Sequence, residues 1–571
     1  MAAIKWKPPQ ADKKRAAPVS LLKNTSNNSR RNNKIFMTAV NSEKKLTFAK
    51  NAKRTCKMLY PIGIQDFEKI RKGGYVYVDK TELIYNLTKQ GGYAFLSRPR
   101  RFGKSLLVST MEAYFCGRKE LFEGLAIAEL EKEWNQYPVL RIDLTGQSYS
   151  DAAALDDTLN AQFISLEKKY HVEEKAVSAA SRFRLLIEAA YNKTGRPVVI
   201  LIDEYDKPIV DNLGNDTLTE AFRAQLQGFY SVMKAKDAYI KFGFLTGVTK
   251  IGKLSVFSGL NNLKDISMDA RYTDICGISE EDLKKYFSES VKELAQANDL
   301  TVKETYNQLA DMYDGYHFCE DTAGMYNPFS LLNTFDSLKF KEYWFETGTP
   351  TFLVKVMQET DYDIPSLSDQ EIDTASLMDV DTVYHNPVPL LYQAGYLTIK
   401  GYEPELGLYH LGFPNREVKH GFLNFLSRYY TPSRTDSGMM LVSKMLREIR
   451  SGNAEGFMQK LEALFSKTSY QIQGDSEKDF QYAMYIILEL MGEYVEVEKA
   501  TSTGRIDILL QTKEYIYIIE IKINDTVEAA LQQIEDKAYA RRFAGDKRRL
   551  FKIGVRFSTE NRCIEDWKVV E

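Results

Sequence analysis

The sequence predicts an α/β protein made of several globular parts. Four continuous apolar runs separated by helix-length segments are typical of buried strands in a parallel sheet that is covered on both faces. They lie at residues 93–96, 139–144, 198–203 and 240–246. A mainly helical stretch follows, and a second group of short strands lies near the C-terminus. Because 571 residues are too many for one core, roughly three domains are expected.

Composition shifts along the chain divide it into four segments. Residues 1–57 are rich in Lys, Asn and Ser without apolar periodicity, so a disordered basic tail is expected. Residues 58–275 hold the parallel-sheet pattern, and residues 276–435 form a mainly helical, winged-helix-like region with short β-like pieces at "GYLTIKGYEP" and "LGLYHLGF". Residues 436–571 form a compact α/β unit. Its pattern predicts helices over 476–491 and 527–542 and strands near 494–498, 505–510 and 515–522.

Several classes of protein are excluded by what the sequence lacks. No apolar run approaches the roughly 20 residues of a membrane span, and the N-terminus lacks the apolar core of a secretory signal. Five scattered cysteines without C-x-x-C spacing indicate reduced thiols and argue against a zinc module or a disulfide framework. Five histidines without short spacing argue against a histidine metal site. A cytoplasmic protein without membrane contact is expected.

The charge is distributed unevenly. Residues 1–57 carry 15 Lys and Arg against two acids, Asp12 and Glu43, although the whole chain has a net charge of −2. A basic arm of this kind can bind nucleic acid nonspecifically by releasing counterions. The alternatives are a solvated tail, or sequence upstream of the natural start, since Met58 opens the first well-patterned segment. Because the remainder is acidic, nucleic-acid contact there would require local basic patches.

A phosphate-binding loop is predicted at "LSRPRRFGKSLL", where a strand ends in a turn and an apolar-periodic helix begins. In such loops, backbone N–H groups and a helix N-terminus converge on an anion, Lys contacts the β/γ-phosphates and Ser ligates Mg²⁺. Gly103, Lys104 and Ser105 supply these groups. Arg98 stands where the usual first glycine would be, and Arg101 adds positive charge beside the phosphates. Both arginines are expected to bind the nucleotide. The alternative is an ordinary strand–turn–helix.

Acidic residues follow a second strand, "PVVILID", which ends in Asp203 and is followed by Glu204. In a parallel sheet this strand end faces the loop, so Asp203 can hold the Mg²⁺ shell and Glu204 can polarise the attacking water. The alternative is a solvated acidic loop. At the end of the next strand, Thr246 or Thr249 could sense the γ-phosphate, although threonines are common at strand ends.

A second group of residues, in "GRIDILLQTKEYIYIIEIKI", points to metal-dependent hydrolysis. Two strands joined by a short turn carry Asp507 on the first and Glu520 and Lys522 on the second. Because side chains alternate along a strand, Glu520 and Lys522 share one face, while Ile519 and Ile521 point into the core. Two carboxylates on adjacent strands suit Mg²⁺, and a nearby lysine can position water. By itself, E-x-K is more often a solvated strand face.

The flanking helices offer further groups. Glu477 lies in line with the apolar stripe of the preceding helix, where it can lean over the metal or simply favour a helix N-terminus. Downstream, Gln533 and Tyr539 are expected near the site. Arg541 and Arg542 are expected to contact phosphates.

Together these motifs resemble a bacterial architecture in which an AAA-ATPase-like domain precedes a C-terminal PD-(D/E)XK nuclease domain. The resemblance covers roughly residues 58–571. It is carried by the motifs "YPIGIQDFEKI", "SRPRRFGKSL", "LIDEYDKPI", "YDGYHF", "YNPFSLLN", "FPNREVK" and "GRIDILL…YIIEIKI". It implies ATP at Gly103–Ser105, Asp203 and Glu204, and metal at Asp507 and Glu520 with Lys522 as catalytic base or orienter.

The expected function is therefore an ATPase whose nucleotide state controls a Mg²⁺-dependent nuclease, with DNA as the favoured nucleic acid. Two alternatives remain open at this stage. In the first, the nuclease fold is inactive and the protein is a nucleotide-switched nucleic-acid binder. In the second, the protein is a scaffold that binds nucleotide without turning it over.

Overall fold

A computed structural model of the chain describes residues 58–250, 256–257, 260, 262–345, 351–360, 362–378, 385–430, 438–466, 477–492, 496–502, 505–558, 560–561 and 563–571. The chain divides into a first unit, Met1–Met58, and a compact unit, Leu59–Glu571. The tail predicted over residues 1–57 lies outside the described residues. Within the described residues, no helix combines the length and apolar character needed to cross a membrane.

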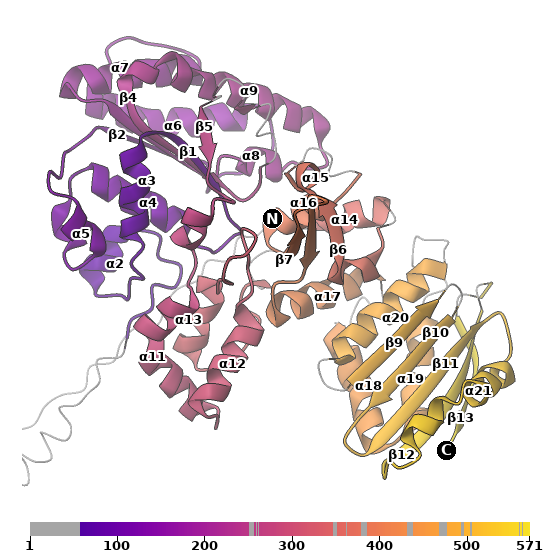
Figure 1. The fold of residues 1–571 in the computed structure, drawn as a ribbon. Helices are drawn as coiled ribbons and strands as arrows, with labels where there is room; N and C mark the ends of the chain where they lie inside the picture. Colours follow the sequence, from indigo (N-terminus) through magenta and orange to yellow (C-terminus); the bar gives the residue numbers. More distant parts are fainter. Residues whose placement is uncertain are drawn as a thin grey trace, which may run out of the picture. The chain divides into compact units, whose positions relative to one another are not determined.

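A five-stranded parallel sheet forms the first part of the compact unit (Figure 1). Its strands pair in the order β2-β3-β4-β1-β5, and they are β1 (Gly92–Ser97), β2 (Val139–Asp143), β3 (Val198–Asp203), β4 (Ile240–Gly247) and β5 (Leu263–Asp265). The first four match the predicted apolar runs to within a residue at each end. Strand β5 was not predicted, because three residues at a sheet edge are too short to produce a periodic signal.

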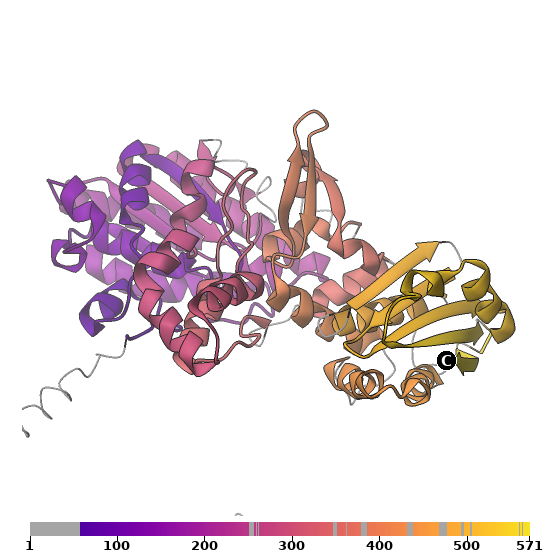
Figure 2. The same ribbon diagram turned by 60° about the horizontal axis from the view of Figure 1, so that its bottom comes forward.

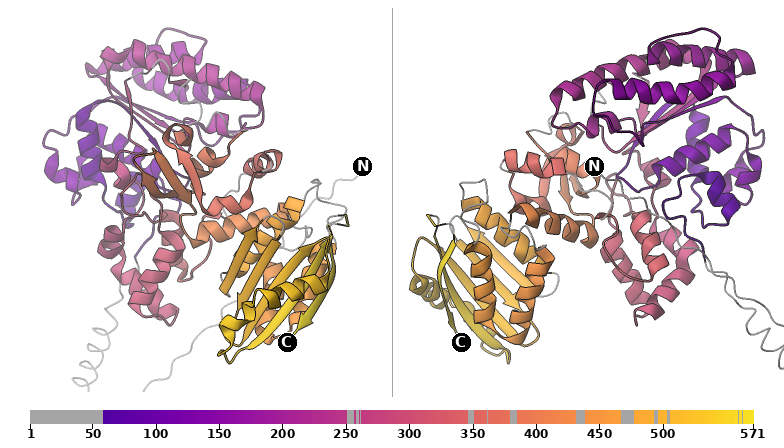
Figure 3. Two further views of the ribbon diagram at one scale, coloured as in Figure 1. Left: turned by 45° about the vertical axis from the view of Figure 1, so that its right-hand side comes forward. Right: turned by 180° about the vertical axis from the view of Figure 1, so that it is seen from behind.

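Helices cover both faces of this sheet, which explains why its strands are apolar on both sides. Helix α4 (Lys104–Phe115) packs on one face, and α6 (Ala153–Tyr170), α7 (Ala179–Thr194) and α9 (Asp216–Ala235) pack together on the other (Figures 1 and 3). The stacked rings of Phe183 and Phe229, 4.5 Å apart, join α7 to α9. The shorter helices are α2 (Phe67–Gly73), α3 (Thr81–Gln90), α5 (Ala126–Leu130), α8 (Lys207–Val210), η1 (Lys119–Phe122), η2 (Asp237–Tyr239) and η3 (Ala270–Ile275).

The middle segment is mainly helical, as predicted. Capping boxes, Ser279 with Asp282 and Thr301 with Glu304, begin α11 and α12. Its helices are α11 (Glu280–Ala297), α12 (Val302–Tyr313), α13 (Pro328–Ser337), α14 (Thr351–Glu359), η5 (Ile364–Ser368), α15 (Thr374–Met378), α16 (Val388–Ala394) and α17 (Arg416–Tyr430). An antiparallel sheet in the order β6-β8-β7 accompanies them (Figure 2). It consists of β6 (Gln370–Asp373), which was not predicted, β7 (Thr398–Glu403) and β8 (Leu408–Gly412).

The C-terminal segment is a mixed sheet flanked by helices (Figure 3). Its strands pair in the order β13-β12-β11-β10-β9, and they are β9 (Glu496–Ser502), β10 (Arg505–Gln511), β11 (Tyr515–Ile523), β12 (Arg549–Ser558) and β13 (Cys563–Val570). Its helices are α18 (Gly438–Ser451), α19 (Ala454–Ser466), α20 (Glu477–Gly492), α21 (Val527–Asp536) and η7 (Tyr539–Phe543).

Two features of the C-terminal segment differ from the sequence-based expectation. The helix predicted over 527–542 ends at Asp536, because Ala538 adopts a φ of 53° and the chain continues as a separate 3-10 helix. Strands β12 and β13 were not predicted. Charged residues interrupt both, and β13 is an edge strand with several exposed side chains, so its apolar signal is weak.

Candidate functional site

The predicted phosphate-binding loop joins β1 to α4. Gly103 is the N-cap of α4, with a φ of 95° in the left-handed region that favours glycine. A Cβ at Gly103 would contact nothing within 4 Å, so the backbone conformation rather than space calls for glycine. Lys104 and Ser105 form the first turn of the helix, where backbone N–H groups lack intrahelical acceptors. The loop therefore presents the donors that an anion requires.

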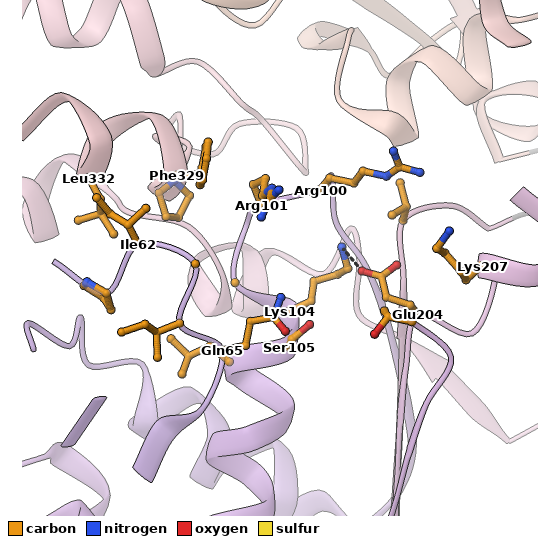
Figure 4. A pocket seen from close by; sticks show the side chains of 18 of the residues that line it. Ile62, Gln65, Arg100, Arg101, Lys104, Ser105, Glu204, Lys207, Phe329 and Leu332 are labelled. Carbon is orange, nitrogen blue, oxygen red and sulfur yellow. Dashed lines mark ion pairs between the residues drawn. The ribbon is translucent and has the colours of Figure 1, made fainter. Parts of the chain in front are cut away.

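Lys104 connects the loop to the end of β3. Its side chain is 3% exposed, and Nζ donates to the Arg98 carbonyl at 3.0 Å and to the Pro99 carbonyl at 3.3 Å. Nζ also lies 3.1 Å from Glu204 Oε1, as Figure 4 shows. A nearly buried cation is thus held between the loop and a carboxylate, at the mouth of the cavity described below.

Asp203, the last residue of β3, is fully buried, and neither carboxylate oxygen has a hydrogen-bond partner among the described residues. Burial raises the pKa of Asp203 to about 6. The nearby Ser105 hydroxyl and the positive charge of Lys104 favour the ionised carboxylate and oppose this shift, whereas the negative charge of Glu204 adds to it. Buried oxygens without partners are costly unless something else satisfies them. A carboxylate beside a serine hydroxyl is a donor set that suits Mg²⁺. The residues present therefore fit the ion.

Glu204 and Asp206 continue the acidic strand end. Glu204 has a φ of 55°, which is strained for a residue with a side chain. Asp206, which the sequence analysis did not single out, is buried and accepts from the backbone N–H groups of Val248 at 3.2 Å and Thr249 at 2.7 Å. Burial raises the pKa of Asp206 to about 6. Asp206 thereby ties the end of β3 to the end of β4.

The two candidate sensor threonines have different environments. The Thr249 hydroxyl donates to Asp206 Oδ2 at 2.7 Å. Thr246 is fully buried, and its hydroxyl has no hydrogen-bond partner within the described part of the chain. Of the two, only Thr246 has a hydroxyl without a partner in the described residues, but like Arg98 it does not line the cavity described below, so its role as a sensor stays a prediction.

A cavity of about 480 Å³ opens beside the loop (Figure 4). The loop contributes Arg100, Arg101 and Gly103–Ser105, and the segment after β3 contributes Glu204, Asp206 and Lys207. An apolar cavity of about 100 Å³ adjoins it and shares Pro61, Gly103, Leu106, Pro328 and Leu332 with it. A polar end next to an apolar end suits a ligand that has both charged groups and a flat apolar part.

Two of the segments that line the cavity were not assigned to the site from the sequence. Residues 61–65 precede α2, and Pro328, Phe329 and Leu332 belong to α13. Both lie within motifs that carry the family resemblance, "YPIGIQ" and "YNPFSLL". Their side chains are mostly apolar, so periodicity alone cannot distinguish them from core residues.

Arg98 and Arg101 lie differently from each other. The Arg98 guanidinium is 1% exposed and donates to the carbonyls of Ser97 at 2.9 Å, Ser267 at 2.8 Å and Tyr272 at 3.3 Å. Arg98 is not among the residues that line the cavity, whereas Arg101 is. A direct contact between Arg98 and nucleotide therefore stays a prediction, and the observed contacts of Arg98 hold the loop in place.

In the C-terminal sheet, the backbone register places Asp507 of β10 directly opposite Glu520 of β11. Glu520 is fully buried and Lys522 is 8% exposed. Lys522 Nζ lies 3.3 Å from Glu520 Oε1 and also donates to Gln533 Oε1 of α21. For Asp507 and Glu477 the structure describes the backbone of their strand and helix but not the side chains. Within the described residues, no group of three or more His, Cys, Asp or Glu side chains forms a metal cluster.

Both faces of β11 are covered. Ile519 and Ile521 belong to the main hydrophobic core, as the alternation predicts. On the opposite face, Ile516 and Ile518 pack against Ile534 of α21. The Glu520–Lys522 face is therefore enclosed rather than solvated, which is unusual for charged side chains unless they are paired or bind a ligand. Tyr539 packs beside this cluster, and Arg541 and Arg542 are exposed on η7.

These features define a class of protein: an α/β domain with a predicted phosphate-binding loop, joined to a mixed sheet that carries a buried E-x-K pair. Comparison with known proteins agrees with this class. Residues 61–257 match the family described as "Predicted AAA-ATPase", and residues 475–567 match the "PD-(D/E)XK nuclease superfamily". Over 515 residues the chain is 36% identical to an "Uncharacterized protein in vnfD 5'region" of Azotobacter chroococcum mcd 1. The aligned region covers 88% of this chain and 97% of that protein. The chain therefore belongs to the family of predicted AAA-ATPases with a C-terminal PD-(D/E)XK domain.

Proposed function

We propose that this protein binds and hydrolyses ATP with Mg²⁺ beside Gly103, and that its nucleotide state regulates a Mg²⁺-dependent nuclease in residues 436–571. One observation carries the nucleotide part. Lys104 of the loop and Glu204, which follows β3, line a cavity that has a polar end and adjoins an apolar one. Asp203, the residue before Glu204, does not line this cavity; it is fully buried, and its carboxylate has no hydrogen-bond partner in the described part of the chain. We place this protein in the bacterial cytoplasm.

The residues of the nucleotide site divide the work. Lys104 turns from Glu204 toward the β/γ-phosphates, and the N–H groups at the start of α4 hold the same anion. Ser105 and Asp203 would hold Mg²⁺, and a bound ion would supply positive charge to neutralise the charge that develops on the phosphates. Once its ion pair with Lys104 is released, Glu204 polarises the attacking water. Thr246 senses the γ-phosphate. The adenine base of ATP would lie against the apolar residues of segment 61–65 and α13.

The nuclease part rests on the enclosed pair of β11. Asp507 and Glu520 would hold Mg²⁺, with Glu477 as a further ligand, and a bound ion would supply Lewis-acid polarisation of the phosphodiester. Lys522 orients the attacking water, and Gln533 holds the Lys522 ammonium. Arg541 and Arg542 contact the nucleic-acid backbone, with DNA as the favoured substrate.

A chain of contacts supports regulation of one site by the other. Helix α17 carries Glu417, which accepts from the backbone N–H of Trp344, and the Trp344 indole donates to the loop residue Arg100. The same helix carries Lys419, whose Nζ lies 2.6 Å from Glu489 Oε2 of α20. Rearrangement of the loop on nucleotide binding can therefore reach the helix that precedes the C-terminal strands.

A reciprocal experiment tests the two sites. Lys104→Ala should lower ATP affinity at least tenfold, about 1.4 kcal/mol, and Lys236→Ala, which removes a lysine paired with Glu188 outside the cavity, should not. Glu520→Ala should abolish metal-dependent cleavage while ATP affinity and basal hydrolysis are unchanged. Lys522→Ala should abolish cleavage but retain metal binding. The control Lys552→Ala, which breaks a surface pair with Glu535, should keep both cleavage and metal binding.

The measurements are nucleotide titration, phosphate release and Mg²⁺- or Mn²⁺-dependent cleavage of single- and double-stranded DNA and RNA, with and without ATP. Equal ATP affinity in wild type and Lys104→Ala contradicts the nucleotide assignment. If wild type cuts no substrate with either metal, the C-terminal segment is a binding module. ATP binding without phosphate release identifies a nucleotide-binding scaffold.

A further inference from the structure

The middle segment contacts five successive residues of the loop, Arg98–Phe102, of which Arg98 stands where the usual phosphate loop has its first glycine. The Arg98 guanidinium lies 4.0 Å from the centre of the Phe318 ring. Phe102 packs edge-on against Tyr316 and Phe318, at 4.8 and 5.3 Å between ring centres. The two ends of the stretch are thus anchored in aromatic side chains that follow α12.

The middle segment also contacts the three central residues, Pro99, Arg100 and Arg101. A Cβ on Gly395 would lie 2.6 Å from Pro99 Cβ, so the end of α16 touches the loop directly. The Arg101 guanidinium lies 4.8 Å from the centre of the Phe329 ring of α13. The Arg100 carbonyl accepts a hydrogen bond from Trp344 Nε1 at 3.2 Å.

Trp344 is itself fixed from two sides. Its backbone N–H donates to Glu417 Oε1 at 2.8 Å, and its ring packs edge-on against Tyr396 with 5.2 Å between ring centres. Its side chain is 7% exposed. The indole therefore approaches the loop from a rigid support.

The loop needs such support because its backbone is strained. Arg101 has a φ of 71°, in the region that residues with a Cβ rarely adopt. The Arg100 carbonyl belongs to the peptide group just before this residue. In a trans peptide the carbonyl and the N–H point in opposite directions, so fixing the Arg100 carbonyl also fixes the direction of the Arg101 N–H.

We propose that Trp344 is a positioning residue for nucleotide binding: its indole N–H sets the conformation of the phosphate-binding loop by holding the Arg100 carbonyl. This inference rests on the proposed ATP site. In this arrangement the bulky loop residues let the middle segment set the shape of the nucleotide site, and nucleotide binding in turn changes the surroundings of Trp344.

The test uses the full chain and two readouts. Trp344→Phe keeps an aromatic ring but removes the N–H donor, so ATP should bind about fivefold more weakly, as expected for one hydrogen bond. Trp567→Phe is the matched control, because it also loses one indole hydrogen bond, to Glu462, outside the nucleotide cavity; ATP affinity should be unchanged. A merely structural role would lower the thermal midpoint of Trp344→Phe without changing ATP affinity at a temperature where both variants are folded.

The second readout does not require Trp344 to be replaced. The chain has four tryptophans, so a variant with Trp6, Trp134 and Trp567 changed to Phe reports on Trp344 alone. Its fluorescence should change on adding Mg²⁺ and ATP, and the change should disappear when Lys104→Ala is added. Unchanged ATP affinity in Trp344→Phe, or unchanged Trp344 fluorescence in a protein that binds ATP, overturns the inference. If wild type does not bind ATP, the proposed function fails as well, and nucleotide titration of wild type distinguishes the two failures.

Discussion

Around the phosphate-binding loop, several charged side chains are buried rather than solvated, and each has a specific reason to be there. Lys104 pairs with Glu204, and Asp206 accepts three hydrogen bonds from the end of β4. Glu417, 1% exposed, accepts the backbone N–H of Trp344. A buried carboxylate is disfavoured in its ionised form, so Glu417 should make the stability of the protein depend on pH.

Burial raises the pKa of Glu417 from 4.5 to about 7, and the nearby Glu342 carboxylate adds to the shift. Between these two pH values the folded protein holds a proton that the unfolded chain has released, so the free energy of unfolding falls as pH rises. Glu417→Gln stays neutral and avoids this loss. We expect the variant to gain on wild type by about 3 kcal/mol between pH 5 and pH 8, measured by urea unfolding at several pH values.

Glu304→Gln is the control for this prediction. Glu304 is an exposed capping residue whose pKa is lowered below 4.5 by its hydrogen bonds with Thr301. Its titration therefore lies below the pH range of the experiment, and its substitution should leave the slope between pH 5 and pH 8 as in wild type. A Glu417→Gln slope equal to that of wild type would show that Glu417 is already ionised at pH 5.

At the scale of elements, the end of α16 packs closely against the loop. Gly395 caps this helix with a φ of 91°, and its Cα faces Pro99, whose ring cannot rotate away. The end of α16 and the loop between β1 and α4, which are far apart in the sequence, thus meet at Gly395. A side chain there meets both a strained backbone and a rigid neighbour.

Gly395→Ala should therefore destabilise the protein and weaken ATP binding, because the added methyl group displaces Pro99 from the loop conformation. Gly407→Ala is the matched control: Gly407 also has a positive φ, 66°, but a Cβ there contacts nothing within 4 Å. Both changes should cost roughly 1–2 kcal/mol of backbone strain. Only Gly395→Ala should also lower ATP affinity, measured by nucleotide titration; equal affinities would mean that the loop adapts to the methyl group.

At the scale of the whole molecule, the charge is divided between the two units. Residues 1–57 carry 15 basic residues, whereas the remainder of the chain is acidic. The chain divides into units at nearly the same point, after Met58. Because residues 1–57 show no apolar periodicity, they should contribute nothing to a hydrophobic core.

Deleting residues 1–57 should leave the thermal unfolding midpoint of the remaining chain unchanged. Calorimetry on the full chain and on residues 58–571 at the same salt concentration measures this. The same pair of proteins shows whether the tail binds DNA nonspecifically, since the truncated protein would then bind with a smaller salt dependence. A markedly earlier unfolding of the truncated protein would contradict the expectation that the tail lacks a packed core.

The elements that could be predicted from the sequence are those whose signal is local. Continuous apolar runs identified β1 to β4, since a strand buried on both faces needs apolar side chains throughout. The Gly103–Ser105 motif and the E-x-K pair were visible because a loop or a strand of a few residues contains their whole chemistry. The family, too, could be recognised from motifs alone.

Which distant residues come together around the proposed nucleotide site became visible only in the packed chain. Segment 61–65, Phe329, Trp344 and Glu417 are far apart in the sequence, and each is compatible with an ordinary core position. Arg98 was expected at the phosphates from its place in the loop, yet its guanidinium lies among backbone carbonyls. Local periodicity records whether a side chain is buried but not what it contacts, because contacts between distant segments arise only when the chain packs.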